Sequence, residues 1–263
     1  MVDDALQASP GRLVVIGICG AQGSGKSTIS DALASALRED GIATAVLSID
    51  DIYLTHAERK ELAQTVHPLL ATRGVPGTHD VALGLATSAA LERGEATALP
   101  RFDKATNDRL CRDAWPLAPS ACRVLIFVGW CVGASAEPIA ALPAAINALE
   151  ADEDPASVWR QYANAALAGP YRTLFARIDC LALLAAPGFD VVFDWRMQQE
   201  RELARSAGPD ASAVMDEAQV ARFIQHYERI TRHILREMPG RADCVVQLDR
   251  HRWPIAITSR HAG

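Results

Sequence analysis

Residues 20–27 read GAQGSGKS, and this stretch decides the fold. It matches the pattern G-x-x-x-x-G-K-[ST] of a phosphate-binding loop. An apolar run at residues 13–18 precedes it, and apolar residues at helical spacing follow it over residues 29–37. A strand before the loop and a helix after it are the context that the motif requires, and they disfavour the alternative of a glycine-rich turn that only joins two elements.

The composition of this loop explains how it would hold a nucleotide. Glycines allow successive backbone N–H groups to turn toward phosphate oxygens, and the N-terminus of a helix adds positive partial charge. We expect Lys26 to reach the β and γ phosphates and the Ser27 hydroxyl to ligate Mg²⁺. ATP and Mg²⁺ are therefore the predicted cofactors. The residues predicted to bind the nucleotide are Gly20, Gly23, Ser24, Gly25, Lys26, Ser27 and Thr28.

Further apolar runs of strand length lie at residues 44–49, 123–128, 179–184 and 243–248. Continuous runs of this kind are typical of strands covered on both faces, as in a parallel sheet. They alternate with helical patterns, of which the clearest begins after Asp216, ends at Pro239-Gly240 and is interpreted as structural. The sequence thus predicts an α/β fold of the P-loop NTPase type, with a doubly wound, mainly parallel sheet, flanking helices and a lid.

No internal repeat or linker divides the 263 residues, so we expect a single domain over residues 1–263. Residues 1–10 are expected to be flexible. Residues 134–155 are rich in Ala and Pro, which is typical of an insertion or an excursion on the side of the lid. The same stretch carries an acidic cluster that we expect to be solvated, formed by Glu150, Asp152, Glu153 and Asp154.

Composition excludes several classes of partner. A formal net charge of −6 leaves no broad basic surface for nucleic acid. The longest apolar run, at residues 180–189, is shorter than the roughly 20 residues that a membrane-spanning helix needs, and residues 1–7 do not resemble a secretory signal. The six cysteines form no C-x-x-C pair and are expected to be reduced. These features predict a cytoplasmic protein that binds neither nucleic acid nor a membrane, and they leave its oligomeric state open.

Two adjacent acids follow the second apolar run, in the stretch SIDDIY at residues 48–53. The carboxyl ends of strands in an open α/β sheet face the ligand crevice, so these acids are expected to face the phosphate loop. Asp50 is the candidate base for an attacking hydroxyl, and with Ser27 it is a candidate metal ligand. Helix capping is the alternative for Asp50. For Asp51 we expect capping or structural binding, since two adjacent carboxylates repel each other in one site.

Seven stretches together resemble the D-glycerate 3-kinase family, which belongs to the P-loop kinases related to phosphoribulokinase, uridine kinase and pantothenate kinase. The resemblance extends from about residue 14 to residue 248. It implies transfer of the γ-phosphoryl group of ATP to the 3-hydroxyl of D-glycerate, which yields 3-phosphoglycerate. The stretches are the phosphate loop, residues 48–55, GTHDV at 77–81, PRFDK at 100–104, GWCVG at 129–133, WRMQQE at 195–200 and YERIT at 227–231.

Such a substrate is small and carries a carboxylate, which cations can hold. Arg101 and Lys104 are the leading candidates, with an exposed surface pair as the alternative. His79 either contacts the substrate or stabilises a turn before a helix that Asp80 would cap. Asp103 either accepts a substrate hydroxyl or anchors Arg101. The predicted acceptor-binding residues are Asp50, Tyr53, His79, Arg101, Asp103, Lys104 and Trp130, the last as a pocket wall or a core residue.

Related kinases keep a lid over the phosphates at the place of residues 195–205. Here this segment carries Arg196, Arg201 and Arg205. A guanidinium delivered by a lid would stabilise charge on the transferred phosphoryl group and help to exclude water. Arg196 is the first candidate, and a solvent-facing helix is the alternative for Arg201 and Arg205. The predicted catalytic residues are therefore Lys26, Asp50 and Arg196.

One position departs from the family pattern. Where the family has Phe-Glu-Gly-Trp, this chain has Val128 in place of the Glu. A carboxylate there would lie beside the metal, so Val128 predicts a kinase that is impaired in catalysis. The alternatives are a kinase for another small acceptor, such as a nucleoside or pantothenate, and a nucleotide-binding regulatory module that has lost catalysis.

Overall fold

The computed structural model describes residues 1–207 and 215–260, and its centre is a six-stranded sheet with strand order β2-β5-β1-β6-β7-β8. The first five strands in this order are parallel, and β8 pairs with β7 in the antiparallel direction. The chain therefore has the predicted α/β fold of the P-loop NTPase type. The strands are β1 (Val14–Gly20), β2 (Thr44–Ser48), β5 (Val124–Gly129), β6 (Cys180–Ala185), β7 (Cys244–Leu248) and β8 (Pro254–Ser259).

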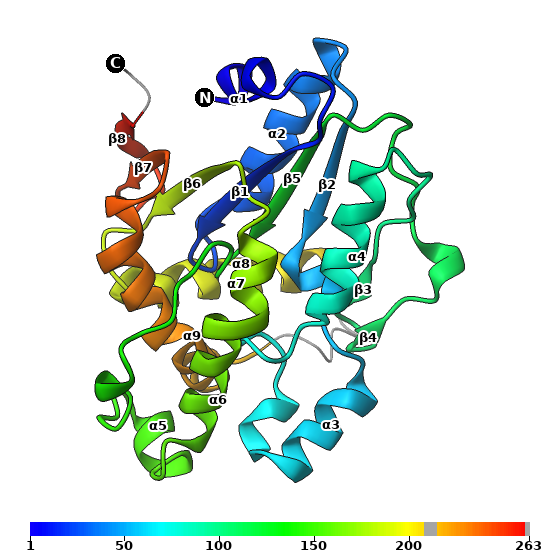
Figure 1. Cartoon of the computed structure of the whole chain (residues 1–263). Coiled ribbons are helices and arrows are strands. Elements are labelled where there is room, and N and C mark those ends of the chain that lie inside the picture. The colour runs from blue at the N-terminus through cyan, green and yellow to red at the C-terminus, as the bar shows by residue number, and fades with distance from the viewer. Residues whose placement is uncertain (208–214, 261–263) are drawn as a thin grey trace.

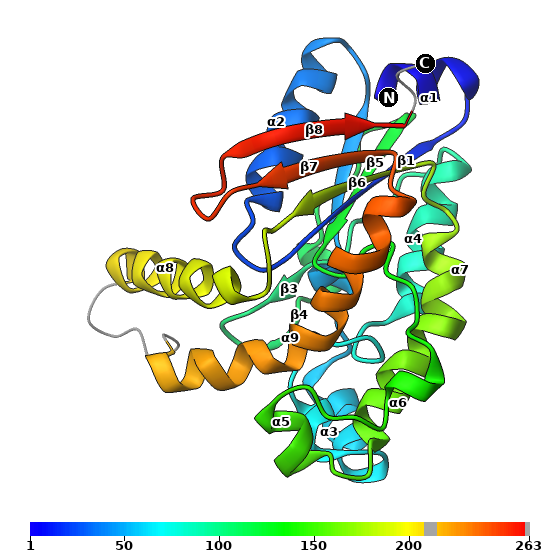
Figure 2. The same ribbon diagram turned by 90° about the vertical axis from the view of Figure 1, so that its left-hand side faces the viewer.

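Helices cover both faces of this sheet (Figures 1 and 2). All residues of β1 and β5 are buried, as expected for central parallel strands. On one face, Ala34 and Leu37 of α2 pack against apolar side chains of β1 and β5. On the other face, α4, α7 and α9 supply the apolar side chains, among them Leu174 and Ile234. The five predicted strands are confirmed to within two residues at their ends.

The helices are α1 (Val2–Ala8), α2 (Lys26–Glu39), α3 (His56–Thr65), α4 (Val81–Glu92), α5 (Ala148–Glu153), α6 (Val158–Ala166), α7 (Arg172–Phe175), α8 (Asp190–Ala207) and α9 (Glu217–Glu237). A two-stranded ribbon, β3 (Phe102–Asp103) and β4 (Asp108–Arg109), lies outside the main sheet. The start of α9 is confirmed, because Asp216 and Gln219 form a capping box there. Its end before Pro239-Gly240 is confirmed as well.

The acidic cluster in residues 134–155 is not solvated as predicted, because two of its members are buried. Glu150 accepts hydrogen bonds from Arg229 Nε and Nη2, each at 2.7 Å. Asp154 pairs with Arg160 at 3.1 Å. These ion pairs attach α5 to α9 and the residue that follows α5 to α6. The prediction was wrong because the two arginine partners lie outside the stretch from which it was made.

None of the described helices combines the length and the apolar character needed to cross a membrane. All six cysteines are free thiols, as predicted. β8 was not predicted from the sequence. Its residues are all exposed, and it adds an antiparallel edge to the parallel sheet.

The buried pair of Glu150 and Arg229 predicts a large loss of stability when one partner is removed. We expect Glu150→Ala to lower the free energy of unfolding by about 3 kcal/mol, because it leaves the Arg229 guanidinium buried with less compensation. Urea denaturation measures the change. Glu153→Ala on the same helix is the matched control, since its pair with Arg222 is exposed and should contribute less than about 1 kcal/mol. Equal losses in both variants would contradict this interpretation.

Candidate active site

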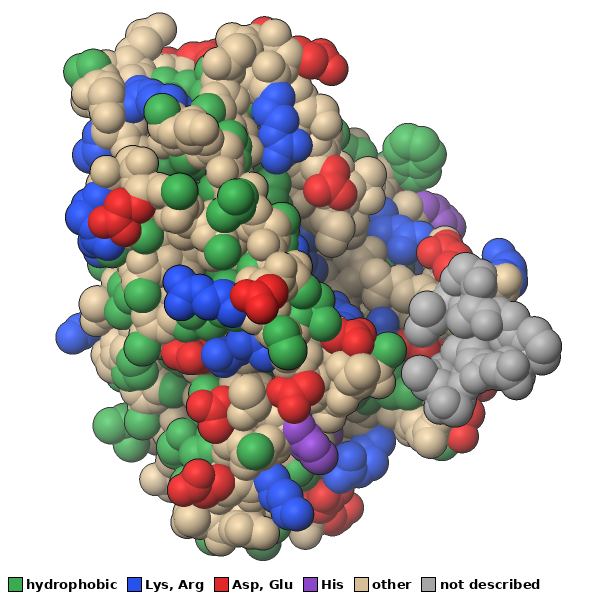
Figure 3. Space-filling view, turned by 90° about the vertical axis from the view of Figure 1, so that its right-hand side faces the viewer, with side chains coloured by type: hydrophobic (Ala, Val, Ile, Leu, Met, Phe, Trp, Pro, Cys, Tyr) green, Lys and Arg blue, Asp and Glu red, His purple; other side chains and the backbone are tan. Residues whose placement is uncertain are grey.

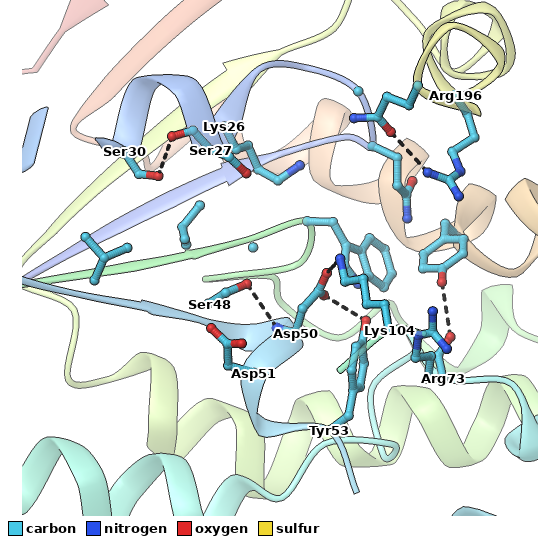
Figure 4. Close-up of a pocket in the computed structure, with 18 of the residues that line it drawn as sticks. Lys26, Ser27, Ser30, Ser48, Asp50, Asp51, Tyr53, Arg73, Lys104 and Arg196 are labelled. Atoms are coloured by element: carbon cyan, nitrogen blue, oxygen red, sulfur yellow. Dashed lines mark hydrogen bonds and ion pairs between the residues drawn. The ribbon is translucent and has the colours of Figure 1, made fainter. Parts of the chain in front are cut away.

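A cavity of about 470 Å³ lies at the carboxyl ends of β1, β2 and β5 (Figure 4). The space-filling view shows a hollow with Lys and Arg side chains at its walls (Figure 3). Residues from the phosphate loop, both acids of the SIDDIY stretch, the segment before β3 and helices α8 and α9 meet there. The lining residues are Gln22, Gly23, Lys26, Ser27, Ser30, Asp31, Val46, Ser48, Asp50, Asp51, Tyr53, Arg73, Arg101, Lys104, Val128, Gly129, Trp130, Arg196, Gln199, Phe223 and Tyr227.

The loop between β1 and α2 has the conformation that an anion site requires. Gly23 and Gly25 adopt φ values of 76° and 89°, which glycine reaches without steric cost. Lys26 Nζ folds back to donate to the carbonyl oxygen of Ala21 at 2.8 Å, and the buried Ser24 hydroxyl has no partner in the part of the chain that the structure describes. Burial lowers the pKa of Lys26 to about 8, although the charge of Asp50 opposes this shift. Bound phosphate would supply partners for both side chains, so the loop fits a nucleotide.

Not every predicted nucleotide-binding residue lines the cavity itself. Gly23, Lys26 and Ser27 do. Four others belong to the loop or to the first turn of α2 and complete its shape: Gly20, Ser24, Gly25 and Thr28. At Gly23, a Cβ atom would lie 2.6 Å from Cβ of Trp195, so glycine also allows α8 to pack closely on the loop.

Asp50 lies in η1 (Ile49–Ile52), the short helix that follows β2. Its Oδ1 accepts a hydrogen bond from Tyr53 Oη at 2.7 Å, and its Oδ2 accepts one from Lys104 Nζ at 2.8 Å. Burial alone would raise the pKa of Asp50, but the charge and hydrogen bond of Lys104 and the hydrogen bond of Tyr53 lower it to about 2. Ser48, rather than Asp50, caps η1. Asp50 is thus an ionised carboxylate on the cavity wall.

Asp51 has a structural partner instead of a helix to cap. It pairs with Arg101 Nη1 at 3.4 Å and accepts a hydrogen bond from the backbone N–H of Phe102 at 3.3 Å. Thr55 caps the following helix, α3. Asp51 therefore fixes the segment that carries Arg101 and leads to Lys104, in agreement with the structural alternative.

Two of the predicted acceptor-binding residues do not line the cavity. Asp103 accepts hydrogen bonds from Ala105 N and Thr106 Oγ1 in the turn between β3 and β4, and it does not anchor Arg101. His79 is buried behind Tyr53, with their rings stacked 4.5 Å apart. Its Nδ1 lies 2.5 Å from Tyr171 Oη. His79 thus positions Tyr53 from behind, while Asp80 caps α4 as expected.

The lid candidate α8 contributes one of its three arginines to the cavity. Arg196 forms an ion pair with Glu200, and its guanidinium lies 5.5 Å from the centre of the Phe223 ring. Its Nε is buried without a hydrogen-bond partner among the described residues. Arg201 and Arg205 are exposed and do not line the cavity. The solvent-facing alternative therefore describes these two residues.

Several cavity residues were not predicted from the sequence. Helix α9, interpreted as structural, supplies Phe223 and Tyr227 to the wall. Arg73 enters from the loop before α4. Trp130, in contrast, was predicted as a pocket wall, and it lines the cavity with its indole N–H bonded to the carbonyl oxygen of Gly74 at 2.9 Å. The YERIT stretch contains Tyr227, so the family resemblance carried a signal for that residue. No motif marked Arg73.

The residues present also fit a magnesium ion. The described residues contain no cluster of three or more His, Cys, Asp or Glu side chains that could hold a metal by themselves. Mg²⁺ does not need such a cluster, because it is usually held by one or two carboxylates, substrate phosphates and water. The Ser27 hydroxyl and the Asp50 carboxylate both line the cavity, and they are the groups that would hold the ion beside bound ATP.

Comparisons with known proteins find relatives of this chain among kinases. The chain is 34% identical to the uncharacterized kinase mug58 of Schizosaccharomyces pombe over 226 residues, which cover 82% of this chain and 79% of that protein. It is 28% identical to the chloroplastic D-glycerate 3-kinase of Arabidopsis thaliana over 224 residues, or 81% of this chain. The matched part is 46% of the plant protein, so the chain spans about half the length of that relative.

A solved structure and a family model add to these relatives. The structure of D-glycerate 3-kinase from Cryptococcus neoformans var. grubii superposes with a TM-score of 0.75 at 26% identity and covers 94% of this chain and 90% of that chain. The family model of the methylmalonyl Co-A mutase-associated GTPase MeaB matches residues 2–54. This segment holds the phosphate loop with its flanking strands and helix, the part shared among P-loop proteins.

Buried His79 predicts a pH dependence of stability. Burial lowers its pKa to about 3, whereas an unfolded His titrates near 6.5. Below about pH 6.5 the unfolded chain therefore takes up a proton that the folded chain does not, and stability falls. Between pH 7 and pH 5, the unfolding free energy of the parent should fall by roughly 2 kcal/mol more than that of His79→Gln. Urea denaturation at both pH values measures this; a constant difference would show that folded His79 titrates normally.

Proposed function

The chain belongs to the D-glycerate 3-kinase family of P-loop kinases, and we propose that it transfers the γ-phosphoryl group of ATP to the 3-hydroxyl of D-glycerate. The product is 3-phosphoglycerate. The observation that carries this proposal is that Lys26 and Asp50 line one cavity together with the cations Arg73, Arg101 and Lys104. Nucleotide phosphates can bind at one end of such a cavity, and a small anionic alcohol can bind at the other.

Asp50 is the proposed partner of the acceptor hydroxyl. Because its carboxylate stays ionised at any physiological pH, it can accept a hydrogen bond from the hydroxyl and align that oxygen with the γ-phosphorus. Its low basicity suits a loose transition state, in which the hydroxyl loses its proton late. Tyr53 and Lys104 hold the carboxylate in place from two sides.

Charge stabilisation is assigned to Lys26 and Arg196. Lys26 begins α2 at the phosphate loop, and Arg196 extends from α8 on another side of the same cavity (Figure 4). Positive groups fixed around a transferring phosphoryl group stabilise the charge on its equatorial oxygens. Bound Mg²⁺, held by Ser27 and Asp50, would neutralise charge on the phosphates. The packing of Trp195 against Gly23 keeps the start of α8 beside the loop and helps to limit access of water.

An ADP-release assay over a panel of acceptors tests the proposed function. The panel is D-glycerate, L-glycerate, pantothenate, uridine and ribulose 5-phosphate. We expect ADP release with D-glycerate, formation of 3-phosphoglycerate and no transfer by Lys26→Ala. ADP release with only one of the other compounds in the panel would identify that compound as the acceptor instead. The second candidate is a nucleotide-binding regulatory module, which the replacement of a family Glu by Val128 favours. ATP binding without acceptor-dependent release of ADP would support it.

Asp50→Asn should lower kcat by roughly 10²- to 10⁴-fold while the affinity for ATP changes little, because the carboxylate serves the acceptor hydroxyl. Steady-state kinetics and nucleotide titration measure the two effects. Asp51→Asn is the matched control and should affect kcat less, since Asp51 pairs with Arg101. A large loss of ATP affinity with unchanged kcat would show that Asp50 serves only the metal or the structure and does not act on the acceptor hydroxyl.

Val128 is the proposed cause of reduced turnover. Its side chain is buried at the cavity wall opposite Ser48 of β2, so a carboxylate there would enter the cavity near the proposed metal site. Val128→Glu should raise kcat by roughly ten- to a thousandfold with nearly constant ATP affinity. Val128→Gln is the control, because glutamine has nearly the shape of glutamate and lacks its negative charge. Equal kcat values for the parent and Val128→Glu at saturating Mg·ATP would show that the carboxylate is dispensable.

A further inference from the structure

Two guanidinium groups on the acceptor side of the cavity lack a carboxylate partner. Arg59 of α3 is fully buried, and Arg73 lines the cavity. Both lie over the ring of Phe102, at 5.7 Å and 5.6 Å from its centre. Both donate to the side-chain oxygen of Asn107, and Arg59 otherwise donates only to backbone carbonyl oxygens. Within residues 1–207 and 215–260, neither guanidinium forms an ion pair.

The other cations on the cavity wall outside the phosphate loop are neutralised. Each has a carboxylate of its own, so its charge is already compensated in the absence of a ligand. The pairs are Lys104 with Asp50 at 2.8 Å, Arg101 with Asp51 at 3.4 Å, and Arg196 with Glu200. Lys26 belongs to the phosphate loop and is expected to serve the nucleotide. Arg73 is thus the cavity-lining arginine whose charge has no carboxylate among the described residues.

The backbone that carries Arg73 is held firmly. The hydroxyl of Tyr227 donates to the carbonyl oxygen of Arg73 at 3.1 Å, and the indole N–H of Trp130 donates to that of Gly74 at 2.9 Å. Gly74 has φ 134°, and a Cβ atom there would lie 2.1 Å from the Tyr227 hydroxyl. Side chains from α9 and from the end of β5 therefore fix this loop. Figure 4 shows Arg73 across the cavity from Lys26 and Ser27.

Two neighbouring cations that form no ion pair with a described carboxylate are costly in this position, since Arg59 is buried and Arg73 is partly buried. Buried charges are normally paired, and burial together with the charge of Arg73 lowers the pKa of Arg59. Asp108, the carboxylate whose charge opposes this shift, accepts hydrogen bonds from the backbone N–H groups of His56 and Arg109. The missing counter-charge is therefore expected to come from a ligand.

We propose that Arg73 binds the carboxylate of the acceptor, with Arg59 as a positioning residue that holds Asn107 and adds positive charge behind it. The inference rests on the proposed kinase function and names the group that recognises its substrate class, a small hydroxy acid. Arg73 and Asp50 line the same cavity, so one end of the acceptor can be held by the guanidinium while its hydroxyl reaches the carboxylate. Arg101 and Lys104, the candidates from the sequence, act instead through Asp51 and Asp50.

The test compares Arg73→Met with the parent on D-glycerate and on glyceramide, in which a neutral amide replaces the carboxylate. For the parent, the KM of D-glycerate should be far lower than that of glyceramide. In Arg73→Met, the KM of D-glycerate should rise on the order of a hundredfold, and the two acceptors should become nearly equal. The affinity for ATP should stay within about threefold. A general structural defect would weaken both acceptors and would keep their ratio.

Two further variants sharpen this comparison. Arg73→Lys retains the charge without the planar fork and should give an intermediate preference for the carboxylate. If thermal denaturation shows that Arg73→Met does not fold, Arg73→Lys replaces it in the comparison with the parent. Arg101→Met is the matched comparison, because Arg101 lies on the same wall with its charge already paired. Loss of the preference for D-glycerate in Arg101→Met, with the preference kept in the Arg73 variants, would overturn the inference.

Failure of this inference and failure of the proposed function give different results. If the parent phosphorylates D-glycerate and Arg73→Met keeps the preference over glyceramide, the anion site is wrong and the function stands. If the parent binds D-glycerate in calorimetric titration without releasing ADP, the function is wrong, and loss of that binding in Arg73→Met still supports the anion site. A parent that neither binds nor phosphorylates D-glycerate contradicts both.

Discussion

The register of three parallel strands is the constraint on which the site depends. Cys19 of β1 lies opposite Gly129 of β5, and Ser48 of β2 lies opposite Val128, so the three strands end at one edge of the sheet. The phosphate loop, η1 and the segment of Trp130 therefore leave the sheet side by side. A slip of one residue in any of these pairs would turn alternate side chains to the other face and separate Lys26 from the acid.

Pairing of charges then decides which groups are free to act. In the cavity, Asp50 is kept ionised by Lys104 and Tyr53, and Asp51 is used to fix the segment of Arg101. Outside it, the pair of Glu150 with Arg229 attaches α5 to α9, the helix that also supplies Tyr227 to the cavity wall. Most buried ions thus belong to the framework. Among the cations that line the cavity, Lys26 and Arg73 form no ion pair with a described carboxylate, and they lie where the proposed substrates would bring negative charge.

The sequence predicted the parts of this site that depend on local patterns. Continuous apolar runs predicted the five parallel strands, and GAQGSGKS with its flanking elements predicted the loop around Lys26. Burial of Glu150 was not predictable, because it depends on Arg229 far along the chain. Arg73 was missed for the same reason, since its loop is positioned by Tyr227, 154 residues away. Long-range partners of polar side chains leave no periodic signal in the sequence.

Val128 shows that the fold and the chemistry of this edge can change separately. In the sheet it lies between Ile18 and Ser48 and packs in the apolar layer beneath α2, where valine stabilises strand and helix together. The same side chain lines the cavity with Ser27, so residue 128 offers no oxygen there to a bound cation. Under the proposed function, Asp50 would have to provide the carboxylate for a bound cation while Lys104 holds one of its oxygens. In the proposed mechanism, Lys104 and the metal would compete for Asp50, and a change at position 128 would act on catalysis through this competition.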